Sequence, residues 1–374
     1  MTFNKKVLAG LVALAAASSA QAVTVAADDG WSLGVSGEVN QFAVFTDDAN
    51  GETSSEIRDG LLPAFLSFDM KAPTMNGLDL AAHISISPST NTTSQQAGTL
   101  EQREVYFTVD GSFGQILAGK ALGLYGSHNI LTEQTLYGVG WGTTGNGTTT
   151  LGGIGLGYDY ADWRSQIKWT SVDMAGFKVA FAVVDGQGPA VQTAAGLTGP
   201  LTVLGGHNDS EDLRYEGDLS YAGSFDGGSY MAWLSGAYQQ HSELGDSADD
   251  AEYVTAGGTL ALGGVELMAQ YSDAQDAVVA GASDADADGN GEWNQYVVQA
   301  GYRFAGTTLV SANYSELESK SSASSDNTAE RVTVGVYHDV NANLKLVAEY
   351  TKVEHDDSTR LDQDIFALGG FVSF

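Results

Sequence analysis

Apolar residues recur at every second position in short stretches along the 374-residue chain, and this alternation most constrains what the chain can fold into. At the C-terminus the apolar or glycine ladder runs on alternate residues from Phe366 to Phe374. The same spacing occurs in residues 78–86, 177–183, 213–221, 265–271 and 344–350. A period of two is the side-chain repeat of a β-strand whose faces differ. The sequence therefore predicts an all-β fold, with about sixteen strands between Trp31 and Phe374.

An antiparallel sheet on a soluble core would show the same alternation, so the pattern alone leaves a soluble and a membrane fold open. Three features favour a transmembrane antiparallel β-barrel, with apolar residues facing lipid and polar residues facing the lumen. Short connectors at 174–176, 263–264 and 341–343 alternate with long polar segments. The strand count is even, as in bacterial barrels. Tyrosines lie near expected strand ends, where an interfacial girdle requires them: Tyr221, Tyr271, Tyr302, Tyr314 and Tyr350.

Residues 1–22 have the pattern of a secretory signal peptide. Lys5 and Lys6 precede the apolar run "VLAGLVALAAA", which is too short to span a bilayer and leads into "AQA" ending at Ala22. We expect the barrel to occupy residues 23–374. No later stretch approaches the roughly 18 consecutive apolar residues of a membrane-spanning helix.

Charge and cysteine content limit the partners of the chain. Removal of residues 1–22 leaves 14 Lys and Arg against 47 Asp and Glu, a formal charge of −33, compared with −31 for the whole chain. Such a chain repels nucleic acid and attracts cations. Because cysteine is absent, no disulfide holds the fold outside the inner membrane. We expect a closed hydrogen-bonded sheet to supply the stability instead.

Two stretches resemble signatures of the general trimeric porins of Gram-negative outer membranes. The first is "SQIKWTSVDMAGFKVAFAV" (165–183), in which Val172 stands where that family usually has proline. The second is "REVYFTVDGSFGQILAGKALGLYG" (103–126), an arginine-led strand, a "GxFG" turn and a strand that ends in a basic residue. The resemblance implies a third loop, about 121–160, folded into the lumen. It also implies a homotrimer in outer-membrane lipid and lipopolysaccharide, and a terminal Phe374 that the barrel assembly machinery reads as its signal.

A barrel of about sixteen strands leaves a water-filled lumen, which predicts passive diffusion of small hydrophilic solutes and ions. The net charge favours cations, although acids in the outer loops act only within a Debye length of roughly 8 Å. The alternatives are an outer-membrane adhesin, a plugged barrel or a secreted soluble β protein. Extraction separates them, because a barrel needs detergent and a secreted protein does not.

Candidate pore residues follow from strand parity and from the resemblance. Parity places on the polar face Glu38, Asp79, Lys168, Lys178, Arg214, Arg303, Arg331 and Lys345. We hypothesise a constriction in which Glu133, on the folded-in loop, faces a wall of Arg103, Lys120 and Lys168. Parity leaves Arg103 undecided, because it shares a face with Val105 and Phe107. Each base could equally be an ordinary solvated lumen charge.

Catalytic and metal-binding signals are weak. The histidines show no HExxH spacing and no GxSxG motif occurs, so we expect neither an enzyme nor a resident cofactor. An acidic loop places Asp284, Asp286, Asp288 and Glu292 at calcium-loop spacing, but position twelve is Gln295 instead of a bidentate Glu. This loop is either a Ca²⁺ site or a solvated acidic segment.

Overall fold

The computed structural model describes residues 23–26, 28–49, 51–90, 99–135, 152–187, 209–240, 250–277, 291–320, 327–356 and 362–374. The predicted signal peptide and three acids of the predicted calcium loop, Asp284, Asp286 and Asp288, lie outside these ranges. The helices within them are η1 (Asp28–Gly30) and α2 (Ser127–Thr132). Neither of these two helices is long and apolar enough to cross a membrane.

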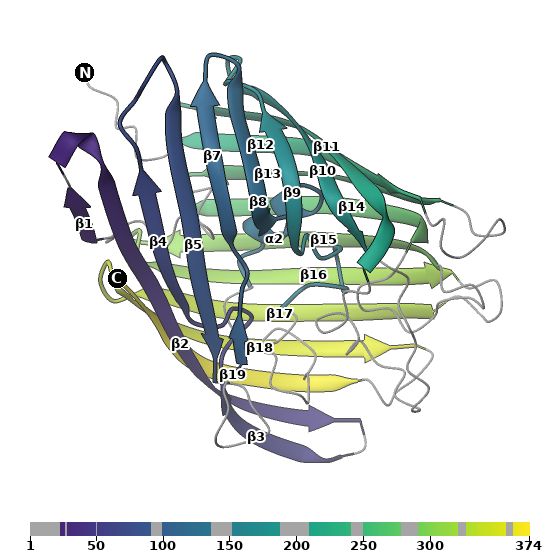
Figure 1. The fold of residues 1–374 in the computed structure, drawn as a ribbon. Coiled ribbons are helices and arrows are strands. Elements are labelled where there is room, and N and C mark those ends of the chain that lie inside the picture. Colours follow the sequence, from purple (N-terminus) through teal and green to yellow (C-terminus); the bar gives the residue numbers. More distant parts are fainter. Residues whose placement is uncertain are drawn as a thin grey trace.

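The strands of the described residues join in one antiparallel sheet of nineteen segments (Figure 1). They are β1 (Val23–Ala26), β2 (Ser32–Asp48), β3 (Thr53–Arg58), β4 (Phe65–Lys71), β5 (Asp79–Ser89), β6 (Thr99–Glu101), β7 (Val105–Gly111), β8 (Gly114–Leu122), β9 (Trp163–Thr170), β10 (Phe177–Gln187), β11 (Asp209–Phe225), β12 (Gly228–Gln239), β13 (Ala251–Leu262), β14 (Val265–Ala277), β15 (Gly291–Phe304), β16 (Thr308–Lys320), β17 (Asn327–Asp339), β18 (Leu344–His355) and β19 (Gln363–Ser373). Segments β3 and β4 both pair with β2, and β6 and β7 both pair with β5, so each couple forms one interrupted span. With β1 as a short addition to β2, the architecture is a sixteen-stranded barrel.

The last strand closes the barrel against the first long strand. The pairing of β19 with β2 runs from Gln363 opposite Asp48 to Ser373 opposite Glu38. The terminal residue continues it, because the Phe374 N–H donates to the Gly37 carbonyl at 2.9 Å and the Phe374 carbonyl oxygen accepts from the Gly37 N–H at 2.8 Å. A Cβ on residue 37 would lie 2.5 Å from Cζ of the Phe374 ring, so only glycine fits beneath it. Closure leaves no unpaired edge along this seam, as a lipid environment requires.

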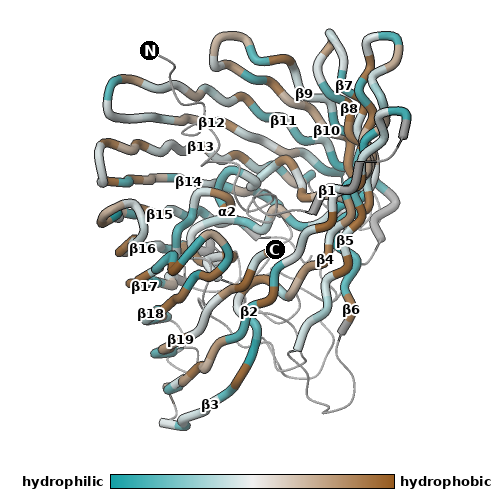
Figure 2. Tube along the Cα trace, turned by 90° about the vertical axis from the view of Figure 1, so that its left-hand side faces the viewer, coloured by the Kyte–Doolittle hydropathy of each residue, from teal (hydrophilic) through white to brown (hydrophobic). Residues whose placement is uncertain are grey.

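Hydrophobic and hydrophilic residues alternate along many strands (Figure 2), and their exposure alternates between the outer face and the interior, as the sequence predicts. In β11, Leu213 and Leu219 are 51% and 45% exposed, whereas Arg214 and Glu216 between them are 2% and 1% exposed. The short connectors are also confirmed: two residues separate β13 from β14, and four separate β17 from β18. Three girdle tyrosines, Tyr271, Tyr302 and Tyr350, are nearly half exposed on the outer face.

The expectation of a uniformly polar lumen is wrong for part of the wall. Apolar side chains of β2, β18 and β19 point inward and are buried: Phe42, Val44, Val347, Val353, Ile365 and Phe371. They belong to one apolar cluster with Ile130, Ile154 and Leu156 of the segment that joins β8 to β9. An apolar inner wall is stable because folded-in chain covers it and removes its surface from water. Figure 1 shows α2, part of this segment, inside the ring of strands.

Candidate functional site

The loop between β8 and β9 is bonded to the inner wall of the barrel through helix α2. Asn129 is fully buried and donates from Nδ2 to Thr255 Oγ1 at 2.8 Å and to Ser272 Oγ at 3.3 Å. Its Oδ1 accepts from Trp233 Nε1 at 3.1 Å. These partners lie on β12, β13 and β14, more than a hundred residues along the chain. A buried amide needs hydrogen-bond partners, and the side chain of Asn129 finds its partners on the barrel wall. These bonds agree with the prediction that the loop folds into the barrel.

The loop continues across the same wall after α2. The Gln134 backbone N–H donates to Gln299 Oε1 at 2.7 Å, and Ser311 Oγ donates to Gln134 Oε1 at 2.8 Å. Gln134 Nε2 also donates to Glu266, which forms an ion pair with Arg303 at 2.7 Å. The loop is therefore anchored over a continuous stretch of wall from β12 to β16.

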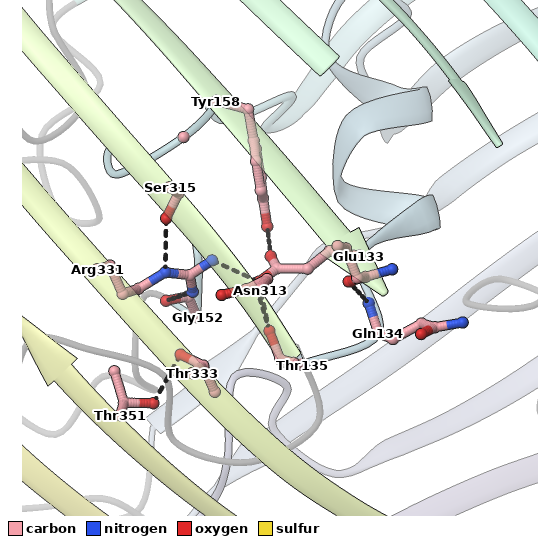
Figure 3. A network of polar contacts seen from close by, with 12 residues as sticks. Glu133, Gln134, Thr135, Gly152, Tyr158, Asn313, Ser315, Arg331, Thr333 and Thr351 are labelled. Carbon is pink, nitrogen blue, oxygen red and sulfur yellow. Dashed lines mark hydrogen bonds and ion pairs between the residues drawn. The ribbon is translucent and has the colours of Figure 1, made fainter. Parts of the chain in front are cut away.

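A buried ion pair forms the centre of this anchorage (Figure 3). Arg331 Nη2 of β17 lies 2.6 Å from Glu133 Oε1, and both side chains are 0% exposed. The carboxylate also accepts from Thr135 Oγ1 at 2.8 Å, from Asn313 Nδ2 at 2.9 Å and from the Tyr158 hydroxyl. Because Arg331 Nη2, Thr135, Asn313 and Tyr158 all donate to the Glu133 carboxylate, the pair has the hydrogen bonds that a buried charge requires.

The second arm of the loop, residues 152–162, packs directly on this ion pair. Arg331 Nη1 donates to the Gly152 carbonyl at 2.8 Å, and its Nε donates to Ser315 Oγ at 3.0 Å. A Cβ on Gly153 would come within 2.6 Å of Arg331 Nη2 and would also overlap the Glu133 carboxylate. Glycine at 153 thus allows the second arm to approach the charges closely.

A second buried carboxylate holds the end of this arm. Asp159 accepts from Tyr125 OH at 2.7 Å, from Trp293 Nε1 at 2.8 Å and from Gln295 Nε2 at 2.7 Å. Burial raises the pKa of the Asp159 carboxyl, and these hydrogen bonds act in the opposite direction. The bonds join both arms of the loop to β15.

Arg214 and Glu216 of β11 organise the start of the loop. Arg214 Nε lies 2.8 Å from Glu216 Oε1, while Glu216 Oε2 accepts from the N–H groups of Leu124 at 2.7 Å and Tyr125 at 3.0 Å. The Arg214 guanidinium lies 4.3 Å from the centre of the Tyr253 ring, a cation–π contact. Arg214, which parity placed in the lumen, is therefore part of the loop anchorage.

Two arginines on the wall formed by β3 and by β6 and β7, away from the strands that anchor the loop, also point inward. Each lies where a strand ends or is interrupted. Arg58 ends β3 and pairs with inward-facing Phe42 in register. Arg103 lies between β6 and β7, where residues 102–104 lie opposite residues 85–86 of β5, so this span carries one extra residue, a bulge. Because a bulge re-aims a side chain, Arg103 joins Glu101 on the inner face, and the ambiguity of its parity is resolved.

Arg164, at the start of β9, differs from the other inward arginines. It is 5% exposed, and its Nε has no hydrogen-bond partner. Arg214 repels its charge, whereas the carboxylates of Asp162 and Glu216 attract it.

The predicted constriction pairs the wrong residues. Glu133 is bound at β16 and β17, whereas the proposed wall was Arg103, between β6 and β7, with Lys120 of β8 and Lys168 of β9. Six strands, β10 to β15, separate β9 from β16, and five spans, β18, β19, β2, β3–β4 and β5, separate β17 from the span of Arg103. Lys120 pairs with Val105 and Ser165 on the outer face and does not line the lumen. Lys168 does face inward, near the carboxylates of Glu216 and Asp218.

The remaining pore candidates lie along the lumen wall without forming one site. Glu38 is near the barrel seam, Asp79 is exposed at the start of β5, and Lys345 lies 3.7 Å from Asp339. Lys178 of β10 pairs with Ser220 and lies at an inward-facing position of its strand. Glu292 is exposed in β15, and the described residues contain no cluster suited to a metal ion.

Sequence reasoning missed Arg58, Arg164 and the carboxylates that pair with Arg58, Arg103, Arg214 and Arg303, namely Glu56, Glu101, Glu216 and Glu266. A usable signal was present, because residues two apart in a strand share a face. The sequence shows an acid two residues from an arginine in "EIR" (56–58), "EQR" (101–103), "DWR" (162–164) and "RYE" (214–216). The structure forms the ion pair in "EIR", "EQR" and "RYE".

Comparison with known proteins identifies the family. The sequence pattern of a family described as "Gram-negative porin" matches residues 8–358 of this chain. Similar solved structures include an anion-selective porin from Comamonas acidovorans (16% identity, TM-score 0.67, covering 92% of this chain and 100% of that one). They also include OmpF of Salmonella typhi in complex with daunomycin (15%, 0.66, 94% and 100%) and a trimer form of OmpT of Vibrio cholerae (13%, 0.56, 92% and 100%). No curated protein matches by sequence. With most of its length matched and a sixteen-stranded barrel of the same fold, the chain belongs to the Gram-negative porin family.

Proposed function

We propose that this outer-membrane porin passes small hydrophilic solutes and ions by passive diffusion and that it prefers cations. A porin is a channel and not an enzyme. Unpaired inward arginines would favour anions at the narrow part of the lumen. The preference for cations is supported by the pairing of these arginines with carboxylates.

The observation that carries the proposal is that five inward arginines each have a carboxylate as an immediate partner. The pairs and their N–O distances are Arg58–Glu56 (2.9 Å), Arg103–Glu101 (2.7 Å), Arg214–Glu216 (2.8 Å), Arg303–Glu266 (2.7 Å) and Arg331–Glu133 (2.6 Å). A paired arginine adds no net charge, and its field falls off faster than that of a single ion. The formal charge of −31 for the whole chain then biases permeation toward cations.

A homotrimer in outer-membrane lipid and lipopolysaccharide belongs to the same proposal. The trimer form of the Vibrio cholerae relative and the apolar outer face support it. The pairing of Phe374 with Gly37 supports a role for the C-terminal strand in assembly, since closure depends on it. The Ca²⁺ site in the acidic loop stays a prediction.

A second candidate, a barrel closed by its own loop, is favoured by one observation. The apolar cluster inside the barrel joins wall residues such as Phe42 and Val347 to Ile154 and Leu156 of the folded-in loop, and these packed side chains take up part of the lumen. A plugged barrel would insert into a bilayer without conducting, which separates it from a porin.

The test of the selectivity is the zero-current potential of the detergent-purified protein in a planar bilayer under a tenfold KCl gradient. We expect the sign that corresponds to K⁺ permeating faster than Cl⁻. The double variant Glu56→Gln with Glu101→Gln, which frees two arginines, is expected to move the potential toward anions. A wild-type potential that favours Cl⁻ would contradict the proposed preference.

A further inference from the structure

A second segment of the chain, besides the loop between β8 and β9, leaves the wall and enters the lumen. The span after β2 is interrupted between Arg58, where β3 ends, and Phe65, where β4 begins. Residues 59–61 of the interruption are all buried. We call residues 59–64 the inner bend. A regular strand would need no such detour, since β3 and β4 pair with the same partner strand.

Asn40 of β2 holds the inner bend over the lumen face of its own strand. Its Oδ1 accepts from the Gly60 N–H at 2.8 Å, and its Nδ2 donates to the Leu62 carbonyl at 2.9 Å. Asn40 is 2% exposed and has the inward parity of Phe42 and Val44. The backbone of residues 60–62 therefore lies on the inner side of the wall.

Asp59 fixes the other edge of the inner bend to β5. Its carboxylate accepts from Ser89 Oγ at 2.9 Å, from the Thr90 N–H at 2.8 Å and from Thr90 Oγ1 at 2.6 Å. Asp59 is 1% exposed. The Ala64 N–H adds a bond to the Pro88 carbonyl at 3.1 Å. Hydrogen bonds to β2 on one flank and to the end of β5 on the other fix the position of the inner bend.

The inner bend and the folded-in loop meet in one apolar cluster. Leu61 is 5% exposed and belongs to the cluster that contains Ile154 and Leu156 of the loop. Leu62 packs against the same cluster and stays partly exposed. Arg58, at the base of the bend, is held beside Glu56. The lumen is thus narrowed from two sides by segments that touch one core.

We propose that the inner bend is a second constriction element, which sets the size limit of the channel together with the loop between β8 and β9. Leu62 borders the permeation path, and Asn40 acts as the positioning residue for the bend. The proposal rests on the proposed function of an open channel, and it assigns a size-determining role to a segment of the wall that would otherwise be a plain strand.

Single cysteines test the proposal, because the chain has no native cysteine. Leu62→Cys places a thiol at the bend, and Ile57→Cys places a matched thiol on the outer face of β3, where the residue is 71% exposed. Both proteins are treated with a bulky charged methanethiosulfonate, the modification is verified by mass, and single-channel conductance is recorded. We expect modified Leu62→Cys to conduct at most half as much as before, and modified Ile57→Cys to be unchanged. An unmodified thiol at 62, or a modified one with unaltered conductance, overturns the proposal.

A second variant tests the positioning role by another readout. Asn40→Ala removes both side-chain bonds to the bend, and we expect at least a 1.5-fold rise in the swelling rate of liposomes in the largest sugar that the wild type admits. Thr351→Val serves as the control, since it removes a buried hydroxyl from β18 that bonds to Thr333. An Asn40→Ala rate equal to that of the control counts against the bend. If the unmodified wild type does not conduct at all, the channel function fails instead.

Discussion

Removing the positive charge of Arg331 is the most informative perturbation of the loop anchorage. Arg331→Met keeps an unbranched apolar side chain at this position but deletes the three hydrogen bonds of the guanidinium. The Glu133 carboxylate then stays buried with only the neutral donors of Thr135, Asn313 and Tyr158. Breaking a buried pair in this way costs about 3–5 kcal/mol, because a charge is left uncompensated.

The free energy of unfolding, measured by urea titration in detergent, gives this cost. Thr351→Val is the control: it removes one neutral buried hydrogen bond to Thr333, worth about 1 kcal/mol. The double variant Arg331→Met with Glu133→Gln should regain part of the loss, since it also removes the stranded charge.

Single-channel recordings of Arg331→Met should also detect the loss of the loop's anchorage at β17. A loop freed from β17 is expected to make the open-channel current noisier, whereas the Thr351→Val current should match the wild type. A loss of stability below about 1 kcal/mol for Arg331→Met, or a double variant less stable than the single one, would refute the argument that this pair anchors the loop.

Three further predictions test other parts of the structure. Lys120→Gln should leave the zero-current potential unchanged, because this side chain is on the outer face, whereas Arg103→Gln should shift it toward cations; equal shifts would contradict the assigned faces. Gly37→Val should lower the yield of folded barrel in refolding assays, while Gly217→Ala, where an added Cβ meets nothing within 4 Å, should not; similar yields would argue against closure at this seam. Gly153→Ala should cost about 1–3 kcal/mol in the urea titration, and a neutral effect would show that the second arm packs more loosely.

The barrel could be predicted from the sequence because its information is local. Alternation on one strand decides the inward and outward faces, and the structure places the side chains of Arg214, Arg303 and Arg331 on the inner face. The tight connectors and the girdle tyrosines follow from the same local pattern. Closure at Phe374 was also inferable, since a lipid-facing edge must pair.

The constriction could not be predicted, because its contacts join residues far apart in the chain. Glu133 and Arg331 are 198 residues apart, and nothing in either local sequence specifies the pairing. Strand parity fails at Arg103, where a bulge changes the phase, and the phase of Lys120 was taken from resemblance instead of from counting along β8. The inner bend was missed because "RDGLLPAF" (58–65) reads as a plain connector.

Single-channel conductance of the purified wild-type protein in a planar bilayer tests the central claim, an open channel narrowed by chain folded into a sixteen-stranded barrel. The account predicts discrete, long-lived steps that appear in groups of three and stay nearly linear with voltage at low potential. Insertion without any conductance would contradict it and would identify a barrel closed by its own loop.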